Sequence, residues 1–157
     1  MIHDLDRIDV VLMEALQKDG RASNKELAGK VGLAPSTTHG RLRRLQSSGV
    51  IRGVHADIDP DALGIGLEAL VFIRLRTHTR EQVSDAWIQL SALPEVVAAW
   101  YVGGDDDIVL HVAVRDTPHL RDLALDKLTS RAEIDRIRTE LVFQHHRSRP
   151  PIYRDPA

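Results

Sequence analysis

The spacing of apolar residues changes once along the chain, and this change constrains the fold more than any other feature of the sequence. Up to Gly49, apolar side chains recur every three or four residues, which is typical of amphipathic helices. From Leu67 onward, stretches that alternate apolar and polar residues are interleaved with helical spacing, which indicates strands mixed with helices. Asp59-Pro60, Gly64 and Gly66 interrupt both patterns. The sequence therefore predicts an α+β protein with a helical domain at 1–56, a linker at 57–66, a mixed domain at 67–150 and a tail at 151–157.

Three helices are predicted in the first domain. The first has Asp4 as its N-terminal cap and ends at Gly20. The second opens with the S-x-x-E pattern at 23–26, in which the Ser side chain accepts a backbone N–H and the Glu side chain reaches back. The third starts at Pro35, which suits the first helical position, and ends at Gly49. Two helices joined by a short turn containing Gly form a helix-turn-helix. After the third helix, Val50–Arg52 and Val54–Ala56 are expected to pair as a short hairpin, or wing.

Charge is divided unevenly between the two parts of the chain. Residues 1–56 carry a net charge of +3 and residues 57–157 a net charge of −5, which sum to the −2 of the whole chain. Every position from Leu27 to Ala56 is free of acidic residues. An acid-free basic block indicates a face that binds a polyanion, with a merely solvated charged surface as the alternative.

The outer face of the third helix carries the residue types that DNA contact requires. If Thr38, Leu42 and Leu45 point inward, the rotation of about 100° per residue turns the opposite face outward and leaves Arg41 on the flank. Arg can bond a guanine edge or a phosphate, and Ser and Thr can meet either. A three-helix dimerisation module with a basic face is the alternative. The predicted contacts to double-stranded DNA are Ser36, Thr37, His39, Arg41, Arg43, Arg44 and, on the wing, Arg52.

The second domain is predicted to have the order βαββαβ, which is the ferredoxin-like topology. Strands are expected at 67–77, 96–102, 108–114 and 137–143, with helices around 83–90 and 117–128. Two helices cover one face of such a sheet, and the other apolar face would stay exposed without a second subunit. We therefore expect a homodimer, which also supplies two reading helices for two DNA half-sites.

Several classes of protein are excluded or disfavoured. The absence of cysteine excludes a disulfide scaffold, a thiolate zinc site and a cysteine nucleophile, and it suits a reducing cytoplasm. The start of the chain does not resemble a signal peptide, and no stretch approaches the ~18 apolar residues of a membrane span. His111, His119 and the pair at 145–146 invite a metal, but no carboxylate or Cys stands at a ligand spacing from them. We expect a soluble cytoplasmic protein that is not an enzyme and has no catalytic residue, metal or cofactor.

Five segments carry a family resemblance. They read L-D-R-I-D at 5–9, L-Q-K-D-G-R-A-S-N-K-E-L-A at 16–28, V-G-L-A-P-S at 31–36, R-L-Q-S-S-G-V-I at 44–51 and D-P-D-A-L-G at 59–64. Together they resemble the Lrp/AsnC (feast/famine) transcriptional regulators of bacteria and archaea. The resemblance implies a winged helix-turn-helix that binds DNA and a βαββαβ effector domain that forms dimers, which assemble into octamers or other higher oligomers. It also implies that amino acids or related metabolites bind at clefts between effector domains.

The resemblance places an effector loop at Gly103–Asp107. The family loop reads close to T-G-D-Y-D, so Gly103 has lost a hydroxyl and Asp106 has replaced an aromatic residue. Two glycines let backbone N–H groups approach a ligand carboxylate, and Asp105 or Asp107 could accept its ammonium group, although a flexible acidic turn is the alternative. Trp100 and Tyr101 point to opposite sides of their strand, so only one can line a cleft. The predicted effector-binding residues are Trp100, Val102, Gly103, Gly104, Asp105 and Asp107.

The sequence thus predicts a sequence-specific DNA-binding transcriptional regulator that a small effector, an amino acid, controls. Two alternatives remain open. One is a nucleoid-associated architectural protein that needs no effector, and the other is a tetrapyrrole decarboxylase of the kind known among Lrp-like chains.

Overall fold

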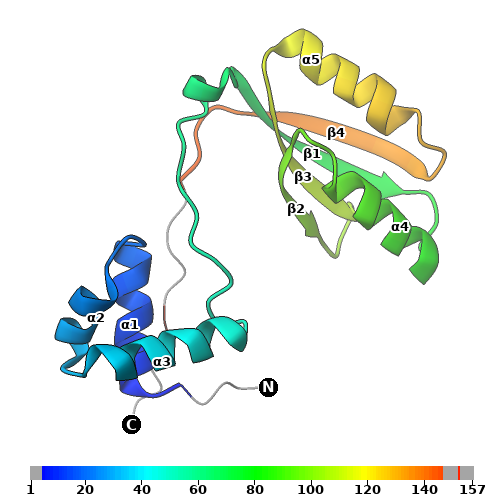
Figure 1. Ribbon diagram of the computed structural model, residues 1–157. Coiled ribbons are helices and arrows are strands. Elements are labelled where there is room, and N and C mark those ends of the chain that lie inside the picture. Colours follow the sequence, from blue (N-terminus) through cyan, green and yellow to red (C-terminus); the bar gives the residue numbers. More distant parts are fainter. Residues whose placement is uncertain (1–4, 147–151, 153–157) are drawn as a thin grey trace. The chain divides into compact units, whose positions relative to one another are not determined.

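The chain forms two compact units in a computed structural model, which describes residues 5–146 and Ile152 (Figure 1). The first unit ends at Asp57, and the second is Ile58–His146. The segment expected as a linker at 57–66 holds a short 3-10 helix at Asp61–Leu63, and the Gly66 N–H donates to the carbonyl of Val114. The tail expected at 151–157 lies outside the described residues, apart from Ile152.

Three helices make up the first unit: α1 (Arg7–Lys18), α2 (Asn24–Val31) and α3 (Pro35–Ser47). The capping box of α2 and the start of α3 at Pro35 are confirmed. The predicted cap of α1 was wrong, because α1 is capped by Asp6 and not by Asp4. The reason is that Asp9, three residues after Asp6, completes a reciprocal capping box, whereas Arg7 stands at that position after Asp4.

The helix-turn-helix is held by a small core. Leu12 and Ala15 of α1 pack with Leu27 of α2, and the half-buried Leu42 of α3 lies against them. Gly32 ends α2 in the left-handed region at φ +66°, which lets the chain turn into α3 within three residues. The inward stripe predicted for α3 is therefore confirmed.

The expected hairpin after α3 does not form. Residues 50–56, all of which the structure describes, contain no strand. Arms of three residues on each side of Gly53 provide too few cross-strand pairs for a hairpin to be stable by itself. Instead, the segment lies beside the end of α1. The two are so close that a Cβ atom on Gly20 would come within 2.5 Å of the Val54 side chain. The wing is thus an extended segment, on which Arg52 is exposed.

The second unit has four antiparallel strands in the order β2-β3-β1-β4, with both helices on one face (Figure 1). This arrangement confirms the predicted βαββαβ ferredoxin-like fold. The last helix, α5, changes to π-helical bonding in its second half. The elements are β1 (Leu67–Leu75), α4 (Arg80–Ser91), β2 (Val96–Tyr101), β3 (Ile108–Val114), α5 (Thr117–Asp122) with its π-helical extension (Leu123–Thr129), and β4 (Ile134–Val142).

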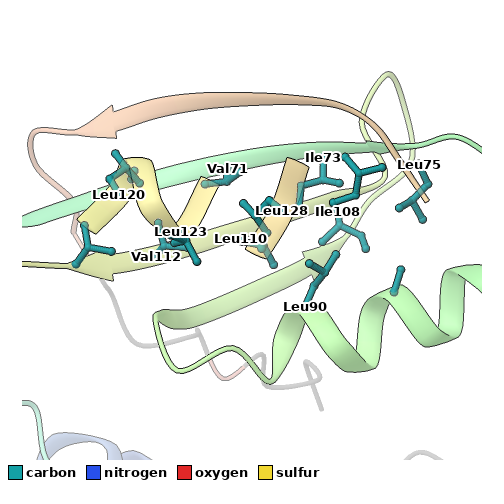
Figure 2. Close-up of a cluster of buried hydrophobic side chains, with 14 residues drawn as sticks. Val71, Ile73, Leu75, Leu90, Ile108, Leu110, Val112, Leu120, Leu123 and Leu128 are labelled. Carbon is teal, nitrogen blue, oxygen red and sulfur yellow. The ribbon is translucent and has the colours of Figure 1, made fainter. Parts of the chain in front are cut away.

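Alternation along the two central strands separates a buried face from an open one. Figure 2 shows the inward residues, such as Ile73 of β1 and Leu110 of β3, packed against leucines of both helices. The residues between them point to the opposite face. There Phe72 pairs with Val109, and Leu70 pairs with His111. Among the described residues no element covers this outer face of the sheet, and these side chains are only half-buried.

Candidate functional site

The outer face of α3 is exposed as the helical spacing predicts. Ser36, Thr37, His39 and Arg43 are exposed, and within the described residues their side chains have no hydrogen-bonding or ionic partner. The buried Thr38 donates its hydroxyl to the Ala34 carbonyl and so faces away from them. The first unit therefore presents a helix face whose polar groups are free to bind a ligand.

The two remaining arginines of this helix are held by α1. The Asp9 carboxylate is fully buried, and it accepts hydrogen bonds from Arg44 and, at 3.0 Å, from Arg41 Nη1. Arg41 also donates to Asp6 Oδ2 at 2.5 Å. This ion-pair network joins α3 to the N-terminal turn of α1. Arg44 remains half-exposed, so its guanidinium meets both Asp9 and the solvent.

The network shifts the pKa values of Asp6 and Arg41. The backbone N–H of Asp9 and the Arg41 guanidinium hold the pKa of Asp6 below its usual value, against a smaller opposing effect of burial. Hydrogen bonds to Asp6 and Asp9 raise the pKa of Arg41. Both shifts favour the charged forms. The Asp6 contribution is therefore present above the ordinary pKa of Asp, 3.8, and is lost as the pH falls through the lowered value.

A second set of polar contacts anchors the loop between β2 and β3. The Asp107 carboxylate is 6% exposed and accepts the Leu75 N–H at 2.8 Å. His78 Nε2 lies 2.9 Å from the same carboxylate, and Arg74 Nη1 lies 3.7 Å from it. Asp107 therefore already has partners on the adjoining strand and loop, which makes it a structural anchor more than a free acceptor for a ligand.

The other residues of the loop differ in the partners that their polar groups have. Arg74 donates to the carbonyl oxygens of Gly104, at 2.9 Å, and Asp105, at 3.2 Å. Arg136 and Arg138 of β4 lie 3.4 and 3.3 Å from the Asp106 carboxylate. The Asp105 side chain is exposed and has no partner within the described residues. Of the three loop carboxylates, Asp105 is the one that is available to bind an ammonium group.

Sequence reasoning missed the three arginines around this loop. They stand on the outer face of the sheet, and β-strand pairing sets Arg74 opposite Arg136 and Phe72 opposite Arg138. The Arg138 guanidinium lies 4.0 Å from the centre of the Phe72 ring. Trp100 belongs to the same row, because it pairs with Val109 and is 48% exposed. Tyr101 points to the other face, so the predicted separation of these two aromatic residues is confirmed by the register.

The histidines that suggested a metal have carboxylate neighbours that the sequence did not reveal. Glu68 Oε2 lies 2.5 Å from His111 Nε2 and 3.7 Å from His145 Nδ1, because β1 and β3 are adjacent. His119 lies 3.4 Å from Glu95, which also accepts from Lys127 at 2.6 Å. The absence of a carboxylate at a ligand spacing in the sequence therefore did not exclude carboxylates that are near in space. Still, no group of residues in the described part of the chain has the arrangement that a metal ion needs.

Comparison with known proteins assigns a family model to each unit. Residues 5–52 match the winged helix-turn-helix DNA-binding model, and residues 68–152 match the Lrp/AsnC ligand binding domain. None of the described helices is long and apolar enough to cross a membrane.

Relatives match along almost the whole chain. The HTH-type transcriptional regulator AldR of Mycolicibacterium smegmatis is 42% identical over 149 residues, which cover 95% of this chain and 87% of the relative. The leucine-responsive regulatory protein of Rhizobium meliloti is 32% identical and covers 90% of each chain. The structure of a transcriptional regulator from Neisseria meningitidis in complex with L-Met superimposes with a TM-score of 0.83 at 28% identity, and covers 93% of this chain and 96% of the other.

The Asp9 network leads to a prediction about the stability of the first unit. Asp9→Asn keeps the shape of the side chain and removes its charge, so Arg41 and Arg44 lose their shared anion. We expect the free energy of unfolding of the first unit to fall by about 1.5–3 kcal/mol, the usual range for a hydrogen bond to a charged group. The exposed Asp57, changed to Asn, is the control.

Both tryptophans lie in the second unit, at positions 87 and 100, which separates the two signals in this experiment. In the Asp9→Asn variant, part of the helical circular dichroism signal should be lost at a lower urea concentration than in the wild type. The urea midpoint of the tryptophan fluorescence should stay the same. Equal shifts of both signals, or a shift with Asp57→Asn alone, would show that Asp9 does not act through α3.

Proposed function

The chain belongs to the Lrp/AsnC family of transcriptional regulators, and on that basis we propose that it binds specific DNA sites under the control of a small effector, an amino acid. The observation that carries the proposal is the exposed, unpartnered face of α3, within a segment, residues 1–56, of net charge +3. Relatives along nearly the full length of the chain are named as transcriptional regulators, which favours this role over that of an enzyme. We place its action in the cytoplasm, where bacterial DNA lies.

The contacts within α3 suggest a division of labour among the predicted DNA-binding residues. Arg43 and His39 have no competing partner, so they are the best candidates to enter the major groove with Ser36 and Thr37. Arg41 is tied to Asp6 and Asp9, which leaves it a positioning role. The half-exposed Arg44 and the exposed Arg52 remain available for phosphates.

Replacement of Arg43 by Ala should weaken binding to the operator by about 1–3 kcal/mol if the side chain reads a base. If it touches a phosphate instead, the slope of log affinity against log salt should become shallower by about one. Fluorescence anisotropy over a range of salt concentrations measures both quantities. Arg44→Ala is the comparison within α3, and Arg80→Ala, an exposed arginine on α4, is the control.

Unchanged affinity and salt slope in both α3 variants would remove α3 as the reading helix. Footprinting then separates a regulator from an architectural protein. A regulator protects defined sites, whereas an architectural protein protects DNA of any sequence.

The loop at Gly103–Asp107 is the proposed effector site. Its backbone is held from β1 by Arg74 and by the bonds of Asp107, so the exposed Asp105 carboxylate projects from a fixed frame. Gly104 has φ +136°, a conformation that favours glycine, and it leaves the backbone open to a ligand carboxylate. Trp100, on the same open face of the sheet, would contact an apolar side chain. The L-Met complex of the Neisseria meningitidis relative supports an amino acid as the class of effector.

A thermal-shift screen of the common amino acids should yield at least one that raises the melting temperature. Asp105→Asn should then lower the affinity for that amino acid by roughly tenfold or more, because the ammonium group of the ligand loses its charged partner. Asp126→Asn, an exposed carboxylate on the π-helical segment, should leave the shift unchanged. An equal shift in all three proteins would place the ligand elsewhere.

Assembly is the remaining part of the proposal. The outer face of the sheet exposes apolar side chains around Phe72 and Val109, and large apolar patches of this kind are rare on monomers. We propose that a second copy covers this face to form a homodimer, and that dimers assemble further, into octamers or other closed oligomers. The dimer would give the protein two copies of α3 for two half-sites.

Val109→Glu places a charge at the centre of this face and should dissociate the dimer in sedimentation experiments. Leu125→Glu changes an exposed leucine on the helical side of the same unit and should leave the mass unchanged. Circular dichroism verifies that each variant is folded. A folded Val109→Glu protein that sediments like the wild type would exclude the sheet as the interface.

A further inference from the structure

A groove on the first unit lies apart from the exposed face of α3. It lies between the second half of α1 and the extended segment at 50–57, and its volume is about 1010 Å³. Met13 and Leu16 of α1 form one wall, and Val50 and Val54 form the other. Val54 is 57% exposed. Its side chain nevertheless lies against the end of α1, because a Cβ atom on Gly20 would come within 2.5 Å of it. The groove thus has apolar side chains on both walls, beside polar residues such as Gln17, Arg52 and His55, and it is only partly filled.

One residue from the far end of the sequence lines this groove. Ile152 is half-buried there, and it groups with the first unit, not with the second unit that precedes it in the chain. In the sequence it follows Pro150 and Pro151 and precedes Tyr153. Prolines restrict the backbone of the unbound chain, so docking of the residue behind them costs less conformational entropy.

We propose that the groove is the docking site for the C-terminal segment of the same chain, with Ile152 as its anchor. The occupant is argued from Ile152 itself, which already forms part of the lining. Docking within one chain is favoured because a covalent connection raises the effective concentration of the segment. The site is separate from the exposed face of α3, so the segment leaves the DNA-binding residues of that helix free, and of the predicted DNA contacts Arg52 alone lines the groove.

Such a contact would give the second unit a second link to the first. The two units are already joined at Asp57–Ile58, and only five residues separate His146 from Ile152, a span of at most about 20 Å. The strand that leads to this segment is β4, whose Arg136 and Arg138 contact Asp106 of the proposed effector loop. A shift of β4 on effector binding would therefore pull on the anchor, a consequence that rests on the proposed function.

The absence of cysteine from the chain allows a direct test. Two double variants, Met13→Cys with Ile152→Cys and Val54→Cys with Ile152→Cys, place thiols on opposite walls of the groove and on the anchor. Mild oxidation of the full-length protein should convert most of at least one pair to a crosslinked monomer, seen as faster migration on a non-reducing gel. Lys25→Cys with Ile152→Cys, in which Lys25 lies on α2 outside the groove lining, is the matched control and should crosslink far less.

Each outcome supports or overturns the proposal. A crosslinked dimer as the main product would show that the segment of a second copy occupies the groove. Failure of both groove pairs, or equal crosslinking of the control, would show that the segment does not dock. A second measurement tests the coupling: Ile152→Asp should at least halve the effector-induced change in DNA affinity. If the crosslink forms but no effector or operator is found, the proposed function fails and the docking site stands.

Discussion

The position of the recognition helix depends on one buried charge, the carboxylate of Asp9. Removal of a carboxylate from water is costly unless charged partners and hydrogen bonds replace the lost hydration. Here the replacements are the Asp6 N–H at 3.2 Å, Arg41 at 3.0 Å and Arg44, so one group completes the cap of α1 and binds α3. The apolar core of this unit is small, with Leu12, Ala15 and Leu27 at its centre. Charge and directional bonds therefore determine the orientation of α3 where the core alone would allow it to shift.

The second unit uses a buried carboxylate in the same way. Asp107 bonds the Leu75 N–H and His78, and Arg74 reaches across to two carbonyl oxygens of the loop. The loop between β2 and β3 is consequently anchored to a strand that is distant in sequence. A preorganised loop loses little entropy when a ligand binds, which suits the proposed effector site. In the second unit the polar groups that hold the loop are different from the Asp105 carboxylate, which is left free, whereas Arg44 of the first unit both holds α3 and stays half-exposed.

Local patterns in the sequence account for the elements, and non-local contacts account for what was missed. Spacing predicted α2, α3 and the strand order, because capping boxes and alternation act within a few residues. The hairpin at 50–56 failed because three-residue arms alternate too briefly to favour pairing over packing against α1. Asp9 had a readable signal, since it stands three residues before Leu12 on the apolar face, where an acid needs a cation. Its partners, Arg41 and Arg44, lie more than thirty residues away and were interpreted as DNA contacts alone.

This pairing reduces the number of arginines in the first unit that are free to contact phosphates. The net charge of +3 over residues 1–56 already includes Asp6 and Asp9 and is unchanged by the pairing, yet Arg41 and Arg44 both contact Asp9. Few phosphate contacts then remain for one α3, and each contributes a slope of only about 0.9 to the dependence of log affinity on log salt. A single unit would therefore bind DNA weakly. Two joined units bind more tightly, because the second binding event becomes intramolecular once the first is made. The proposed dimer through the open face of the sheet would therefore matter for DNA binding as much as α3 does, since joining two chains would supply the affinity that one helix lacks.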